Sequence, residues 1–232
     1  MKKLIIILIF MVSSISVYGA EKAGIIENFE GRVQIYDGTS PRPENVTETK
    51  TEIYEHNRVA TKREATALLK FINEDKIALA ENSVLTVEST NTYAPEAGRV
   101  VFSIKTRGKT SGVNISLTTA VIGVKGTKFV VDTSETGRNA IFLKEGELEV
   151  TSKEGNFKKY SEVQIDEYEA YVKKMMGEYD QYVKDLQENF VEYVHNFKMK
   201  AGSAFAIDGS EVHEIKFNKD IEQAFYLLND VE

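Results

Sequence analysis

Residues 107–110 read R-G-K-T, and G-K-T is how the phosphate-binding loop of many nucleotide-binding proteins ends. That loop also needs a glycine five residues before its second glycine, but this chain has Ser103 there. A helix must follow the loop, whereas residues 113–117 alternate like a strand. The sequence therefore favours a surface loop between two strands over a phosphate site.

The other side chains that could do chemistry are also badly spaced for it. His56, His195 and His213 each lack a second histidine or a cysteine at the spacing of zinc ligands. The chain has no cysteine, and it has no Gly-x-Ser-x-Gly nucleophile motif. Glu145 and Glu147 could form a carboxylate pair, but they flank a predicted turn, where solvated acids are common. We expect no enzyme activity, no cofactor and no metal site.

Residues 117–150 carry the clearest structural pattern in the chain. Apolar side chains alternate with polar ones in short runs, as at Phe129 and Val131 and again at Leu148 and Val150. Alternation with a period of two predicts half-buried strands. Glu145-Gly146 separates two such runs and predicts a tight hairpin, because glycine adopts positive φ without steric cost.

Similar runs extend back to residue 24, separated by polar segments at residues 37–50 and around Pro95 that we interpret as loops. The apolar faces are rich in valine, isoleucine and leucine, which suits a twisted sheet folded onto itself. We therefore predict a mainly β protein, with an antiparallel β roll or sandwich over residues 21–162.

Several motifs in this region resemble the FecR domain. The sequence G-V-K-G-T-K-F at residues 123–129, followed by E-G-E-L-E-V at residues 145–150, is the most specific part of the resemblance. Residues 57–88 are similar to the strands that precede this core in the family. Within the core motif, Lys125 stands where arginine is usual in the family. The residues that carry the signature are Gly123, Gly126, Thr127, Phe129 and Gly146.

The resemblance implies a protein-interaction or signal-sensing module of the bacterial cell envelope. In the family, this domain often forms the periplasmic part of transmembrane regulators of sigma factors, where it contacts the periplasmic domain of an outer-membrane transporter. No internal segment of this chain is apolar enough to cross a bilayer. We therefore expect a stand-alone exported form that acts through an envelope partner.

The first twenty residues match a secretory signal peptide. Lys2 and Lys3 precede a short apolar run, and small residues offer cleavage after Gly19 or Ala20. We predict export, with a periplasmic location. The whole chain has a net charge of −7. An acidic chain is a poor partner for nucleic acid or for anionic lipid.

Apolar residues recur every three or four positions after residue 165, which predicts one long amphipathic helix over residues 163–202. Its stripe packs either on the β domain or on another protein, since this much apolar area is costly to leave in water. Tyrosines in the stripe favour an interface. The candidate interaction surface consists of Tyr168, Val172, Met175, Tyr179, Val183, Leu186, Phe190, Tyr193 and Phe197.

Residues 203–232 predict a β-hairpin around Asp208-Gly209 and then a short helix that begins after Asn218. Taken together, the patterns favour a non-enzymatic exported protein that binds an envelope protein. The first alternative is a structural protein that self-associates through the long helix. A glycan-binding module is the second alternative, and the absence of tryptophan makes it the weaker one.

Overall fold

The structure is a computed structural model that describes residues 20–40, 42–106, 112–134, 137–160, 171–172, 174–179, 181 and 191–229. Most of these residues lie in strands, which confirms the mainly β prediction. Residues 1–19, which carry nearly all of the predicted signal peptide, lie outside the described part, so export remains a prediction.

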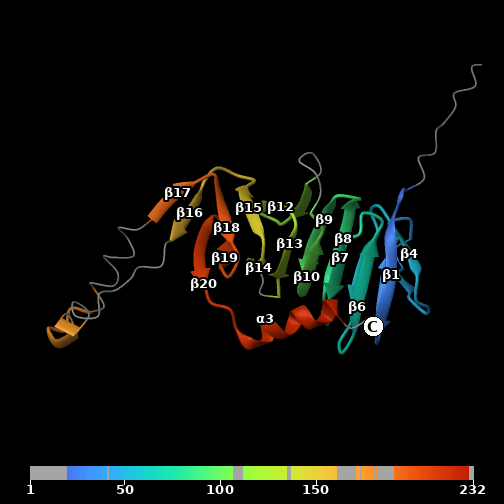
Figure 1. The fold of residues 1–232 in the computed structure, drawn as a ribbon, viewed down its shortest axis with the longest axis horizontal. Coiled ribbons are helices and arrows are strands. Elements are labelled where there is room, and N and C mark those ends of the chain that lie inside the picture. Colours follow the sequence, from blue (N-terminus) through green and yellow to red (C-terminus); the bar gives the residue numbers. More distant parts are fainter. Residues whose placement is uncertain are drawn as a thin grey trace, which may run out of the picture.

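The strands form two large sheets that face each other, and within each sheet the strands follow one another along the long axis of the molecule (Figure 1). The first, which we call sheet A, has eleven strands. In spatial order they are β17 (Val191–Val194), β16 (Phe157–Tyr160), β20 (Glu211–Ile215), β19 (Ala204–Asp208), β14 (Arg138–Glu145), β13 (Thr127–Asp132), β10 (Arg99–Ile104), β7 (Lys76–Leu79), β6 (Thr66–Phe71), β1 (Lys22–Glu30) and β4 (Thr51–Tyr54).

Sheet B has nine strands. In spatial order they are β18 (Asn196–Lys200), β15 (Glu147–Ser152), β12 (Ala120–Val124), β11 (Val113–Ser116), β9 (Thr92–Ala97), β8 (Val84–Ser89), β5 (Arg58–Thr61), β2 (Val33–Tyr36) and β3 (Glu44–Asn45). Both sheets are mixed rather than purely antiparallel, because β9 runs parallel to β11 and β16 runs parallel to β20.

The chain builds the two sheets together by crossing repeatedly from one to the other. It passes, for example, from β12 in sheet B to β13 in sheet A, and from β14 in sheet A to β15 in sheet B. From β5 to β15 the chain advances along the long axis, and the neighbours β6 and β7, β8 and β9, and β13 and β14 are consecutive in sequence (Figure 1). The sheets are nevertheless held together mainly by long-range pairing, as where β14 pairs with β19 and β16 pairs with β20.

One apolar core lies between the sheets and holds side chains from both, as a sandwich requires. Phe102 and Phe129 are fully buried there, and their rings stack with centroids 4.8 Å apart. Tyr93 from sheet B packs against Phe71 from sheet A, with ring centroids 4.6 Å apart. Because the chain has no cysteine, burial of this core supplies the stability that disulfides give many exported proteins.

A C-terminal helical segment covers part of the outer face of sheet A. It consists of α3 (Lys219–Ala224) and the 3-10 turn η1 (Phe225–Leu228), and it crosses the strands (Figure 1). Ile221, Phe225 and Leu228 bury their side chains against a row of small and apolar residues on successive strands. That row includes Leu68, Ala78, Val101, Val130, Phe142 and Ala204.

The cap of this helix is the one expected from the sequence. The Asn218 side-chain Oδ1 accepts a hydrogen bond from the backbone N–H of Ile221 at 2.9 Å. The hairpin before it is also confirmed, because β19 pairs with β20 across Asp208-Gly209. The hairpin continues sheet A through pairing of β19 with β14.

Replacing Asn218 with alanine is expected to lower the free energy of unfolding by about 1 kcal/mol, because a helix N-terminal N–H loses its acceptor. Urea-induced unfolding followed by circular dichroism measures the change. Asn218→Asp, which keeps the acceptor, is the matched control and should recover most of the loss. An equal loss in both variants would show that the cap does not stabilise this segment.

The predicted helix over residues 163–202 is wrong for its last part. Residues 191–200 form β17 and β18 instead, joined at His195. The physical reason is visible at Phe197 and Met199, which are buried on one side of β18 while Lys198 and Lys200 lie on the other. This alternation favours a strand. It was missed because the apolar residues before it recur every three or four positions, which is typical of a helix.

Two predicted turns are also wrong. Glu145-Gly146 is not a hairpin, because β14 and β15 belong to different sheets and Gly146 is the corner between them. Residues around Pro95 form β9 rather than a loop. Proline fits there because β9 pairs with β11 only at Thr92 and Tyr93, so the missing N–H at residue 95 removes no bond to that neighbour.

Candidate functional site

The end of sheet A formed by β16 and β17 is the candidate site. These strands pair antiparallel, with Tyr160 directly opposite Val191. Residue 160 and residue 191 therefore lie side by side in the sheet. Residues 161–190, which we call the inserted segment, connect these two neighbouring strands.

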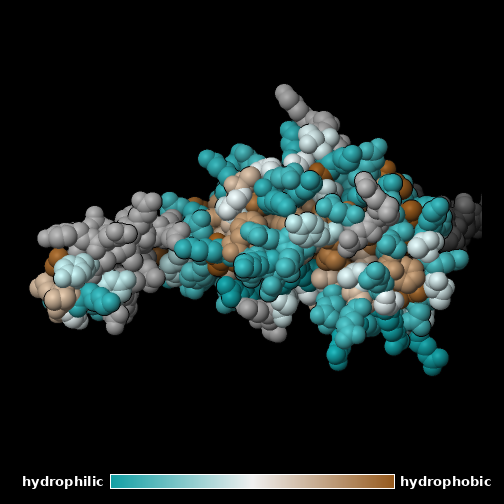
Figure 2. All heavy atoms as spheres, turned by 60° about the horizontal axis from the view of Figure 1, so that its bottom comes forward, coloured by the Kyte–Doolittle hydropathy of each residue, from teal (hydrophilic) through white to brown (hydrophobic). Residues whose placement is uncertain are grey.

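The described residues of the inserted segment present large apolar side chains to solvent. Tyr171, Met175 and Met176 have 62%, 71% and 63% of their surface exposed. Residues 171–172 and 174–175 are helical, and the helical turn ends at Gly177, which has φ +73°. Hydrophobic colour is visible at this end of the molecule in Figure 2. Exposed apolar groups that gather in one place mark binding surfaces.

The adjoining strand β17 adds Tyr193, which is 70% exposed. Among the described residues, six large apolar side chains are exposed, and four of them belong to the inserted segment or β17. The other two are Ile72, in the turn after β6, and Tyr226, in η1. The exposure is therefore concentrated at one end of the sandwich instead of being spread over its surface.

The outer face of sheet A at this end carries aromatic and charged side chains in register. Tyr160 lies opposite His213 of β20, and their rings stack with centroids 4.3 Å apart. Lys158 lies between Tyr193 and Glu211, with its Nζ 3.8 Å from the Glu211 carboxylate. The Tyr160 hydroxyl is the main reason that the pKa of Lys158 is above its ordinary value. This face can thus offer a ring stack and paired charges to a partner.

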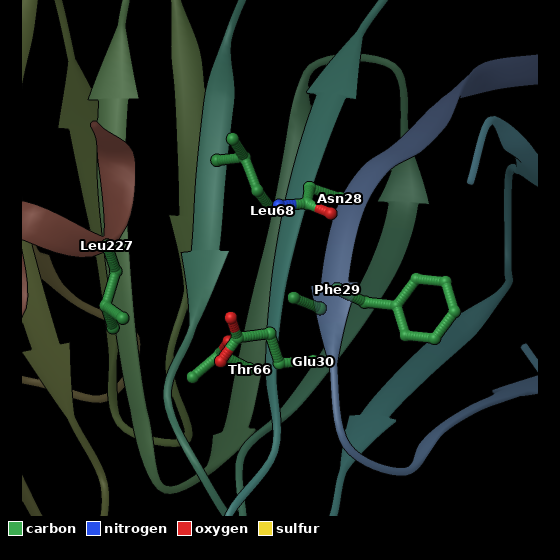
Figure 3. Close-up of a pocket in the computed structure, with 7 residues that line it drawn as sticks. Asn28, Phe29, Glu30, Thr66, Leu68 and Leu227 are labelled. Carbon is green, nitrogen blue, oxygen red and sulfur yellow. The ribbon is translucent and has the colours of Figure 1, made fainter. Parts of the chain in front are cut away.

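A second set of concave features flanks the C-terminal helical segment. A pocket of about 240 Å³ is lined by Lys76, Lys128 and Lys144 together with residues of η1. Lys76 and Lys128 pair with Glu27 and Glu145, at 3.7 and 3.3 Å. A smaller pocket of about 30 Å³ lies where Leu227 faces β1 and β6 (Figure 3). Since carboxylates already neutralise two of the lysines, these hollows are weaker candidates for a site.

The predicted interaction stripe is not one face of one helix. Tyr193 and Met175 are exposed, Val172 and Tyr179 are half-buried, and Phe197 is 8% exposed in the core between the sheets. Phe197 is therefore a core residue, which corrects its place in the stripe. The remaining members lie outside the described residues: Tyr168, Val183, Leu186 and Phe190.

The signature residues gather at a corner of the sandwich. Gly126 turns the chain from β12 into β13 with φ +65°, and Gly146 turns it from β14 into β15 with φ +92°. Each glycine has no room for a Cβ, because Thr106 crowds Gly126 and Thr127 crowds Gly146. Phe129 lies in the core, whereas Gly123 lies in β12 with ordinary van der Waals space around it. Gly126 and Gly146 thus position the strands that they join.

Buried polar groups form a hydrogen-bond network where the ends of β5, β8 and β10 meet. The Ser83 hydroxyl accepts a hydrogen bond from the Arg99 N–H at 3.0 Å, and the Ser83 N–H donates to the Thr61 hydroxyl at 2.9 Å. Thr61 in turn donates to the Ala80 carbonyl at 2.5 Å. These bonds fasten β5, β8 and β10, which lie in different sheets, to one point. The network satisfies buried polar groups, so its role is structural.

The grouping of Lys158, Tyr160 and His213 could not be predicted from the sequence. They lie on strands more than fifty residues apart, and only the parallel pairing of β16 with β20 brings them together. The alternation of Phe157 and Lys158 was the only local signal for a strand there. Among the described residues, no group of three or more His, Cys, Asp and Glu side chains could hold a metal ion.

In the described part of the chain, no helix combines the length and the apolar character needed to span a bilayer.

Comparison with known families confirms the resemblance inferred from the sequence. Residues 57–149 match the model of the family described as FecR protein. The match begins just before β5 and ends within β15, so it includes all five signature residues. It leaves out the inserted segment and the C-terminal hairpin and helix. No curated protein matches the chain.

Among solved structures, the chain is similar to two crystal structures of a "putative anti-sigma factor" from Parabacteroides distasonis. Both are 12% identical to this chain, with TM-scores of 0.47 and 0.46. The similarity covers 75% of this chain and 65% and 64% of those chains. The matched part thus spans less than two thirds of the length of either relative.

Proposed function

We propose that this chain is an exported, non-enzymatic interaction module of the bacterial cell envelope, which senses a signal by binding an envelope protein. The observation that carries the proposal is the concentration of exposed apolar side chains at the β16–β17 end of the sandwich. Such side chains are costly in water and gain free energy when a partner covers them.

The family match over residues 57–149 supports a signalling role for the β framework. The basic, apolar and small-residue pattern of the first twenty residues supports export into the periplasm. The large apolar side chains of the strands are mostly buried in the core between the sheets. The described residues of the inserted segment, which follows β16 and precedes β17, expose Tyr171, Met175 and Met176 instead.

The test removes these three apolar side chains together, as Tyr171→Ser, Met175→Gln and Met176→Gln. Each buried side chain of this size contributes about 1.5–3 kcal/mol, so the triple variant should lose at least tenfold in capture of its envelope partner. The measurement is quantitative pull-down from an envelope fraction, beside the thermal midpoint of the purified chain. The midpoint should not change, because these side chains are exposed.

Ile72→Ser is the matched control, since Ile72 is 57% exposed but lies in the turn after β6. It should capture the partner as well as the unmodified chain does. Equal capture by the triple variant and the control would contradict the proposal. So would a loss of capture in both, because the binding would then depend on general hydrophobicity.

A further inference from the structure

Among the described strands, β17 leaves one side as an open sheet edge. β17 is the last strand of sheet A and pairs only with β16 among the described strands. Backbone N–H and C=O groups on the other side of such a strand have no ladder partner and form a template for an added strand. The strand is half-buried at Val191 and Val194 and exposed at Glu192 and Tyr193.

The other end strands are better protected against pairing. β3 has only two residues, and β4 sits beside a register irregularity in its neighbour β1. β18 carries two lysines, Lys198, which pairs with Glu147 at 3.1 Å, and Lys200, and lysines on an edge strand disfavour strand addition. β17 has no proline, glycine or lysine, and its single charge, on Glu192, is paired with Lys159 at 3.4 Å. It is therefore the edge most open to a further strand.

The sequence of β17 suits a second copy of the same strand. In an antiparallel pair related by a two-fold axis normal to the sheet, opposite residues lie on the same face, so a residue faces one of the same parity. One register places Glu192 opposite the partner's Glu192, which repels. The next register places Tyr193 opposite the partner's Tyr193 and Glu192 opposite the partner's Val194. Aromatic cross-strand pairs stabilise and facing like charges destabilise, so the second register wins.

The charge around this edge does not oppose the approach of two copies. Lys158 pairs with Glu211 and Lys159 pairs with Glu192, so the edge is locally neutral even though the chain is acidic. Charges elsewhere on the two copies are largely screened beyond about 8 Å at physiological salt. Tyr193 also has most of its surface free to pack in a pair.

We infer that β17 is the docking edge for a second copy of this chain, which extends sheet A across a two-fold axis with Tyr193 against the partner's Tyr193. The inference rests on the proposed function and deepens it, by naming a second copy as one partner at the end that carries the inserted segment. The interface is isologous, and it therefore closes at a dimer.

The chain's lack of cysteine makes this register directly testable with Tyr193→Cys. Directly opposite residues of an antiparallel pair have Cα atoms about 4.5–5.5 Å apart, which suits a disulfide. Mild oxidation of the purified variant should convert most of it into a covalent dimer. Tyr226→Cys is the matched control, because Tyr226 is 65% exposed on η1, away from the edge, and it should cross-link at least tenfold more slowly.

Sedimentation of the unmodified chain completes the test. It should show a dimer at micromolar concentration. Tyr193→Glu places like charges opposite one another across the axis, while within the chain it places an acid beside Lys158, so it should return the protein to a folded monomer. The inference is overturned by a monomer in the unmodified chain, by equal cross-linking of the two cysteine variants, or by open polymers that would join β17 to another edge. If the dimer fails while the triple variant still loses capture of an envelope protein, only the dimer is rejected.

Discussion

Phe129→Ala should lower the free energy of unfolding by about 4 kcal/mol, since replacing a buried phenylalanine with alanine costs about 3–5 kcal/mol. Phe129 is fully buried and stacks on Phe102 with the two rings 7° from parallel. It lies in β13, between β10 and β14 in the middle of sheet A. The side chain cannot be replaced by water, because its surroundings are apolar, so a cavity remains.

Urea-induced unfolding followed by circular dichroism measures this loss. Tyr226→Ala removes a ring that is 65% exposed and serves as the control, which should change stability by less than about 0.5 kcal/mol. A loss below about 1 kcal/mol for Phe129→Ala would mean that the core between the sheets is not packed as described.

Gly146→Ala is expected to cost about 4 kcal/mol. The φ of +92° is a conformation that an L-residue adopts only with strain, for about 1–3 kcal/mol. The added Cβ would also lie 2.5 Å from the Thr127 Cγ2 and 2.6 Å from the Gly126 carbonyl oxygen. Relief of that overlap requires the corner between β14 and β15 to move, at about 1–3 kcal/mol more.

Gly202→Ala separates the two causes. Gly202 has φ +86°, close to that of Gly146, but a Cβ there would meet nothing within 4 Å. The control should therefore show only the backbone strain, about 1–3 kcal/mol. Equal losses in the two variants, again from urea unfolding, would contradict the close approach at the corner.

Features written in a few neighbouring residues could be predicted from the sequence. Asp208-Gly209 specifies a hairpin and Asn218 specifies a helix start, and both are found because turn and cap chemistry acts over three or four residues. The β class follows from alternation. The FecR resemblance depends on glycines whose corner geometry is also local, at Gly126 and Gly146.

Features set by long-range pairing could not be predicted. A glycine between two strand patterns predicts a turn, but the pattern is the same whether the turn closes a hairpin or leads into another sheet. Gly146 therefore indicated a turn without indicating that β15 lies in the other sheet. The apolar residues of 191–200 also fit a helical spacing. They form strands because β18 pairs with β15, and this pairing buries Phe197 and Met199. The candidate site was found only in part, since Met175 and Tyr193 were expected at a surface but the stack of Tyr160 on His213 was not.

The central claim is that the sandwich is a self-sufficient framework and that the inserted segment does the binding. Excision of residues 161–190, with Tyr160 joined to Val191 through Asn-Gly, tests it most directly. The two residues are already opposite each other, so a two-residue turn closes the hairpin without altering either strand. The measurement is partner capture from the envelope fraction by this variant, normalised to its folded fraction.

We predict a variant that unfolds at the same midpoint as the full chain and captures no partner. A folded variant that still captured the partner would contradict the account, because binding would then reside in the framework. A variant that failed to fold would contradict it equally, since the sandwich would then depend on the segment for its stability.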